Sequence, residues 1–230
     1  DVLVATDYAT SQSGNNLFFD MILRNSNLPP GGNTQFDQAK ALHPKAVTLW
    51  IGSNDILGGA TGGDPVVGTN VTPPAYWETL FDPILDSIAT IGADYVAVAT
   101  IPSITSAPFF TAVPLGFEIE GVGTPPWQTD EDDVAHILLP YGSGLDATYL
   151  APPYGTGTSS IPSTGTLTTA EATAVEATID AYNDHIRSEA ASRGWALADV
   201  AQALEDIGAG TAELNLFFCW GPAGQNATSA

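Results

Sequence analysis

Two apolar runs constrain the fold of this chain more than any other feature. Residues 46–51 (AVTLWI) and 95–101 (YVAVATI) are almost continuously apolar. Such runs are typical of parallel strands covered on both faces, whereas one-sided antiparallel strands alternate apolar and polar residues. A third, shorter run at 195–200 follows a long helical stretch. The order strand, helix, strand, helix, strand predicts an open α/β sheet.

The helix before the third run has well-defined ends. Thr168 and Glu171 form a capping box at its start, and Gly194 supplies a left-handed stop at its end. Helical spacing predicts one buried stripe along it: Val175, Ile179, Tyr182, Ile186 and Ala190. A second helix is expected at about 75–91, burying Trp77, Phe81, Leu85 and Ile88, with shorter helices at 17–25, 34–42 and 200–207.

The stretch from about 106 to 165 interrupts this rhythm. It is rich in proline, glycine and threonine, and we expect a long irregular insertion with one helical patch at 130–139. Long insertions of this kind tend to be functional or mobile, and this one follows the end of a strand, so it is a candidate cover for a ligand site. The acidic cluster 130–133 is interpreted as the start of the helical patch rather than as a cation site.

Charge and cysteine content exclude several classes of protein. The chain has 5 basic and 26 acidic residues and a net charge of −21, which disfavours nucleic acids and anionic lipids as partners. Its one cysteine, Cys219, excludes an internal disulfide and a cysteine-rich metal site. No run approaches the ~18 apolar residues of a membrane span, so no stable membrane insertion is expected. Because the chain opens at Asp1 without a leader or initiator methionine, we expect the natural start to lie upstream.

The most unusual short sequence is Gly52-Ser53-Asn54-Asp55, directly after the first apolar run. In open α/β sheets, ligands bind beyond the carboxyl ends of the strands. Gly52 would let the backbone turn sharply, and Asn54 could direct its amide into the crevice. A fixed amide donor stabilises the oxyanion of acyl transfer, and losing one costs about 10²–10³ in rate. The other interpretation is a simple turn and helix cap.

Further segments match the surroundings of this motif in a known family. These are residues 49–57 (LWIGSNDIL), 39–44, 96–102, 180–186 and 198–200. Together they resemble SGNH (GDSL-type) hydrolases, in particular bacterial secreted lipases and esterases, over roughly residues 15–208. The resemblance implies a flavodoxin-like three-layer αβα sandwich with a parallel sheet. It also implies hydrolysis of small or lipid carboxylic esters by a serine nucleophile, with no metal or cofactor. Asn54 would be the side-chain oxyanion donor and Gly52 the glycine of the same block.

Other blocks of the family are missing. Residues 1–50 contain neither its Gly-Asp-Ser-Leu-like nucleophile block nor its second oxyanion glycine, and no Asp-x-x-His follows Val200. Two of the five expected strands are also missing. We therefore expect residues 1–230 to form a single but partial SGNH-like domain, a fragment cut at both ends of a longer protein.

No residue present is an evident substitute for the missing catalytic groups. His43 precedes a strand, at the wrong edge of the sheet, and His185 lies inside the long helix, where a structural or surface role is expected. His136, in the insertion, stays open as a minor candidate. Ser53 and Ser103 lie at the correct edge without an evident histidine and acid partner.

The sequence therefore leaves two functions open. The first is a secreted ester hydrolase. The alternative is a non-catalytic carbohydrate- or surface-binding α/β domain that has lost the catalytic blocks. A nucleotide-binding domain is disfavoured, because no glycine-rich phosphate loop follows a strand and the charge is strongly negative.

Overall fold

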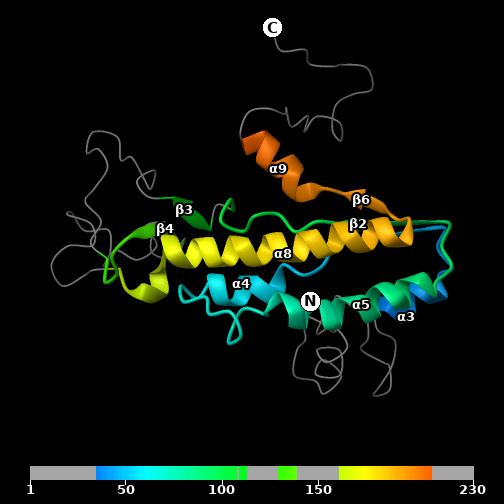
Figure 1. Ribbon diagram of the computed structural model, residues 1–230, viewed down its shortest axis with the longest axis horizontal. Coiled ribbons are helices and arrows are strands. Elements are labelled where there is room, and N and C mark those ends of the chain that lie inside the picture. Colours follow the sequence, from blue (N-terminus) through cyan, green and yellow to red (C-terminus); the bar gives the residue numbers. More distant parts are fainter. Residues whose placement is uncertain (1–34, 108, 113–128, 139–160, 209–230) are drawn as a thin grey trace, which may run out of the picture.

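The computed structural model describes residues 35–107, 109–112, 129–138 and 161–208 (Figure 1). Its helices are α3 (Gln35–Ala41), α4 (Asn54–Ala60), α5 (Pro74–Ala89), α8 (Thr169–Arg193), α9 (Val200–Gly208) and the 3₁₀ turn η2 (Ser163–Gly165). Its strands are β1 (Ala46–Leu49), β2 (Tyr95–Ala99), β3 (Phe110–Ala112), β4 (Val134–Leu138), β5 (Thr166–Thr168) and β6 (Ala196–Ala198). The helix expected at 17–25 and Cys219 lie outside the described residues.

The three apolar runs form one parallel sheet in the order β1-β2-β6. Val47 of β1 pairs with Val96 of β2, and Val98 of β2 pairs with Leu197 of β6. Helix α5 lies between β1 and β2 in the sequence, and α8 precedes β6. The predicted mixed α/β class with a parallel sheet is therefore confirmed.

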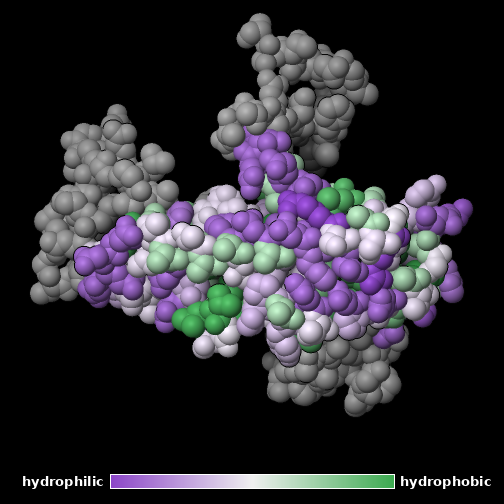
Figure 2. All heavy atoms as spheres, viewed as in Figure 1, coloured by the Kyte–Doolittle hydropathy of each residue, from purple (hydrophilic) through white to green (hydrophobic). Residues whose placement is uncertain are grey.

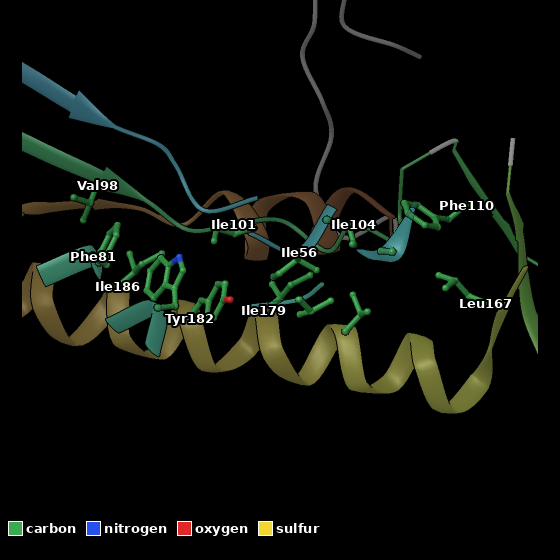
Figure 3. Packing of buried hydrophobic residues seen from close by; sticks show 14 of the residues in the cluster. Ile56, Phe81, Val98, Ile101, Ile104, Phe110, Leu167, Ile179, Tyr182 and Ile186 are labelled. Atoms are coloured by element: carbon green, nitrogen blue, oxygen red, sulfur yellow. The ribbon is translucent and has the colours of Figure 1, made fainter. Parts of the chain in front are cut away.

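The core lies between this sheet and the helices α5 and α8, which run side by side beneath the strands (Figure 1). Trp77 of α5 is sandwiched between the rings of Phe81 and Tyr182, each with a centroid 4.2 Å away. The predicted stripe of α8 is buried, and Figure 3 shows Ile179, Tyr182 and Ile186 directed toward residues of the strands and loops above them. Burying each large apolar side chain contributes about 1.5–3 kcal/mol, so this layer stabilises the packing of the helices on the sheet.

The opposite face of the parallel sheet is exposed among the described residues. Ala46, Thr48 and Ala196 are exposed there, and Tyr95 is 73% exposed. Coverage of both faces, which the apolar runs predict, is therefore not met within the described part of the chain.

The surface agrees with the acidic composition. The face seen in Figure 2 is mostly hydrophilic, with small apolar patches. Within the described ranges, no helix combines the length and the apolar character that crossing a membrane requires.

The predicted helical patch at 130–139 is wrong. Residues 134–138 form the strand β4, which pairs antiparallel with both β3 and β5. Its Ile137 and Leu138 are buried, and this sheet pairing outweighs any local helical preference. The acidic residues 130–133 precede a strand, so the helix-start interpretation is also wrong. The described part of the insertion contributes β3 and β4 to a small antiparallel sheet, and most of 106–165 lies outside the described residues, so the irregular insertion stays a prediction.

The ends of α8 are as the sequence predicts. The Thr168 side chain accepts a hydrogen bond from the Glu171 backbone N–H, and Glu171 accepts one from the Thr168 backbone in return. Gly194 ends the helix in the left-handed conformation with φ 66°. The helices predicted at 34–42, 75–91 and 200–207 are likewise confirmed as α3, α5 and α9.

Candidate active site at the carboxyl edge of the sheet

The carboxyl ends of the three parallel strands meet at one edge. The ends of β2 and β6 are tied together there by polar contacts. Thr100 donates its hydroxyl to Asp199 over 2.9 Å and accepts a hydrogen bond from the Ala201 backbone N–H over 2.9 Å. Arg187 of α8 donates to Asp199 as well, at 3.2 Å. These hydrogen bonds join the ends of β2 and β6 to α8, at the edge where the loops after β1 and β2 leave the sheet.

The surroundings of Asp199 favour its ionised form. The hydrogen bond from Arg187 is the main reason that its pKa is lowered, with help from Thr100, the Gln202 backbone N–H and the charge of Arg187; burial opposes them. The carboxylate therefore joins α8 to the ends of two strands.

Gly52 gives the loop after β1 its shape. It has φ +114° and is buried. A Cβ at this position would lie 2.5 Å from Cδ1 of Ile101 and 3.2 Å from Cζ2 of Trp77. Only glycine combines that backbone angle with this close approach. The backbone role predicted for Gly52 is thus confirmed, whereas its role in catalysis stays a prediction.

Asn54 is the first residue of α4 and is exposed. Its side chain makes no hydrogen bond with the residues that the structure describes. The Ser53 side chain, at the N-cap, makes no capping hydrogen bond there either. The capping half of the turn-and-cap interpretation is therefore not met. The turn itself is present, because the Gly52 carbonyl accepts a hydrogen bond from the Asp55 N–H at 3.1 Å.

Asp55 has a structural role beside Asn54. Its Oδ1 accepts a hydrogen bond from the Thr72 hydroxyl at 3.3 Å, and its backbone carbonyl accepts one from the Thr72 N–H at 3.0 Å. Tyr182 donates its hydroxyl to the Thr72 carbonyl. Burial and the charge of Asp55 raise the pKa of Tyr182, so its hydroxyl stays a donor at neutral pH. Asp55 and Tyr182 thus hold residue 72 against α4 and α8.

Asn183 anchors the loop after β2, and the sequence analysis did not single it out for this role. It is 2% exposed, and its side chain accepts from the Ile101 N–H at 2.7 Å and donates to the Ile101 carbonyl at 2.8 Å. The only signal in the sequence is an amide next to Tyr182 on a helix whose stripe is apolar. Asn183 therefore positions Ile101, the residue that packs on Gly52.

Ser103 has a carboxylate partner, contrary to the sequence analysis. Its hydroxyl donates to Oε1 of Glu176 at 2.8 Å, and the same oxygen accepts from the Thr105 hydroxyl at 2.6 Å. Within the described residues, no histidine is hydrogen-bonded to Ser103. A serine whose proton points to a shared carboxylate is held as a structural clamp rather than activated as a nucleophile.

The three histidines lie in different parts of the fold. His43 precedes β1 with φ 47°, at the amino end as predicted. His185 is hydrogen-bonded to Asp82 of α5 at 2.7 Å, between α5 and α8. His136 lies on β4, and burial lowers its pKa, partly offset by a hydrogen bond to the Phe110 backbone and by the charge of Glu176. It is not within hydrogen-bond contact of Ser103, so the structure does not assemble a Ser–His pair from described residues.

A depression of about 640 Å³ lies elsewhere, on the exposed face of the sheet. It is lined by Ala46, Tyr95 and Trp195 among others, and neither Gly52 nor Asn54 borders it. Its position near the amino ends of the strands is the opposite of where open α/β sheets bind ligands. We therefore assign the candidate site to the carboxyl edge.

Comparison with known proteins assigns no family. No family model, no curated protein and no solved structure matches this chain. The function therefore rests on the residues at this edge.

Proposed function

We propose that this chain is part of a secreted carboxylic-ester hydrolase of the SGNH type, in which Asn54 donates a hydrogen bond to the oxyanion. The observation that carries the proposal is the contrast between the constrained Gly52 and the exposed Asn54 at the carboxyl edge of the sheet. Gly52 leads the backbone into α4 with a positive φ and a close approach to Ile101 that a side chain would strain. The Asn54 side chain lies exposed at the start of that helix, without a hydrogen bond to the described residues.

The proposed architecture is a flavodoxin-like αβα sandwich. Three parallel strands with α5 and α8 against one face agree with two of its three layers. The exposed face around Tyr95 is where the third layer would pack.

In the proposed reaction, a serine hydroxyl attacks the ester carbonyl and a histidine takes the serine proton. The carbonyl oxygen becomes negative, and the Asn54 amide stabilises it. The histidine then gives the proton to the leaving alcohol, and water completes hydrolysis of the acyl-enzyme. We assign neither the serine nor the histidine to a described residue, because Ser103 is bound to Glu176 and His136 does not reach it.

The substrate is proposed to be an uncharged ester. A net charge of −21 disfavours anionic ligands. Trp50, between β1 and Gly52, is 58% exposed and offers an apolar surface four residues before the proposed oxyanion donor in the sequence. Location outside the cell belongs to the same proposal.

The test is hydrolysis of p-nitrophenyl acetate and butyrate by the purified protein, with and without a serine-directed phosphonate. In a protein that carries the serine and histidine blocks together with these residues, we expect hydrolysis that the phosphonate abolishes, and the labelled serine then identifies the nucleophile. A folded protein of that kind that shows no hydrolysis above background contradicts the proposal, whereas these 230 residues alone are expected to show none.

The alternative is a non-catalytic carbohydrate- or surface-binding domain. It is favoured by the structural use of Ser103 and by the missing serine and histidine blocks. Binding of an oligosaccharide, followed by the fluorescence of the exposed Trp50, together with no ester hydrolysis, would support this alternative.

A further inference from the structure

A second group of polar side chains lies between α5 and α8. Asp82 comes from α5, and His185 and Glu189 are one turn apart on α8. One nitrogen or oxygen atom from each of the three lies within 4.8 Å of the others. The closest pair is Nε2 of His185 and Oδ1 of Asp82, 2.7 Å apart. Two adjacent helices thus bring an imidazole and two carboxylates to one point.

Aromatic contacts hold the imidazole in position. The His185 ring meets Trp77 and Phe81 edge-on, with centroid distances of 6.1 and 6.3 Å. The His185 side chain is 17% exposed, whereas that of Asp82 is 45% exposed. The group is therefore oriented from the core side and open from the solvent side, where an ion could enter.

The charges around the group are unbalanced. Among the described residues, one cation lies beside the carboxylates of Asp82, Asp86 and Glu189. This is Arg193, which bonds to Asp86 at 2.7 Å and to Glu189 at 3.0 Å. With His185 counted as neutral, the described side chains of this group carry two more negative than positive charges. The chain has only five lysines and arginines in all. A divalent cation would balance the excess.

Arg193 does not prevent Glu189 from turning toward an ion. Its guanidinium also lies over the Trp195 ring, 5.3 Å from the centroid. Arg193 therefore keeps Asp86 and Trp195 as partners when Glu189 leaves.

We propose that Asp82, His185 and Glu189 bind one Zn²⁺ ion that joins α5 to α8, with water as the fourth ligand. Zinc accepts imidazole nitrogen and carboxylate oxygen at about 2.0–2.2 Å, which places tetrahedral ligand atoms ~3.3 Å apart. The observed ligand atoms lie within 4.8 Å of one another, so the proposal requires small side-chain movements to reach that spacing. The imidazole favours zinc over magnesium or calcium, which prefer oxygen ligands. The ion stabilises the helix pair and takes no part in ester hydrolysis, so this proposal stands apart from the proposed function.

The test is a calorimetric titration of the full 230-residue chain with zinc chloride. We expect one equivalent to bind. Asp82→Asn and Glu189→Gln should each weaken binding at least about tenfold, since losing even an outer partner of a metal ligand costs roughly 10–100-fold. His185→Ala should abolish binding, and Arg193→Gln should tighten it by removing the competing cation. His43→Ala, a histidine outside the group, is the matched control and should bind as the unsubstituted chain does.

Thermal unfolding separates a specific site from general charge screening. Zinc should raise the melting temperature of the unsubstituted chain more than that of Glu189→Gln at the same zinc concentration, because the variant binds zinc more weakly. Magnesium at that concentration should leave the melting temperature of both proteins unchanged. Glu189→Gln is a conservative change at a partly exposed position, so its result stands even if His185→Ala does not fold. Absence of zinc binding by the folded chain, equal binding by Glu189→Gln, or equal stabilisation by magnesium would each overturn the proposal.

Discussion

The loops after β1 and β2 reach the same edge of the sheet and are held by different means. The loop after β1 is shaped by packing, because Gly52 fits against Ile101 and Trp77 with no room for a side chain. The loop after β2 is held by polar side chains, with Asn183 bonded to Ile101 and Glu176 bonded to Ser103.

The difference indicates which polar groups serve the fold and which are available to a ligand. After β2, the buried polar groups have partners inside the protein, as folded structures require. After β1, the packing of Gly52 shapes the turn and Asp55 is bonded to Thr72, whereas the Asn54 side chain is left exposed at the start of α4. A residue that contributes little to stability at a ligand-binding edge is a candidate for chemistry.

The largest expected effect comes from Gly52→Ala. A Cβ 2.5 Å from Ile101 at φ +114° is both strained and overpacked, so we expect a loss of about 3–5 kcal/mol in unfolding free energy. Gly58→Ala in α4 is the control, because a Cβ there meets nothing within 4 Å and should stabilise the helix by up to about 1 kcal/mol. Urea unfolding measures the unfolding free energy of both variants. The same change in unfolding free energy for both would show that the packing of Gly52 does not shape this loop.

Asn183→Ala tests the loop after β2. The substitution leaves the N–H and carbonyl of Ile101 buried without partners, which should cost about 2–4 kcal/mol. Asp184→Ala, the neighbouring exposed position with one surface ion pair, should change stability by less than about 0.5 kcal/mol. If the two variants unfold at the same denaturant concentration, Asn183 is not the anchor.

Asp199→Asn should give a pH-dependent effect. Because the pKa of Asp199 is lowered in the folded state, its ionised form contributes stability above the unfolded pKa of ~3.9, and this contribution is lost as the pH falls through the folded value. With the pair about one-third exposed, we expect Asp199→Asn to lose about 1–2 kcal/mol at pH 7. The unfolding free energies of the unsubstituted protein and Asp199→Asn should differ at pH 5–8 and converge at acid pH. A constant difference down to pH 2 would show that the ion pair of Asp199 is not the cause.

Ser103→Ala should have a smaller effect. Thr105 still bonds to Glu176 after the change, so the expected loss is about 0.5–1 kcal/mol. Phosphonate labelling and ester hydrolysis should be unaffected. Loss of labelling in this variant, with folding intact by circular dichroism, would identify Ser103 as the nucleophile and refute its structural assignment.

The sequence was informative where local signals and burial agree. The capping box at Thr168 and the apolar runs at 46–51 and 95–101 predicted α8 and the parallel strands. It failed at 130–139, because β4 depends on pairing with distant strands that no local pattern reveals. At the site, the backbone role of Gly52 was readable from its place after a strand. The contacts of Asn183 and Glu176 were not, since their partners are 82 and 73 residues away.

If Asn54 serves catalysis rather than the fold, Asn54→Ala should separate kcat from the melting temperature. In a protein that carries the serine and histidine blocks and hydrolyses p-nitrophenyl butyrate, we expect kcat to fall about 10²–10³-fold with KM little changed and the melting temperature within about 1 °C. Ser53→Ala should leave both values unchanged. An unchanged kcat in Asn54→Ala, or a fall matched by loss of folded protein, would contradict the assignment.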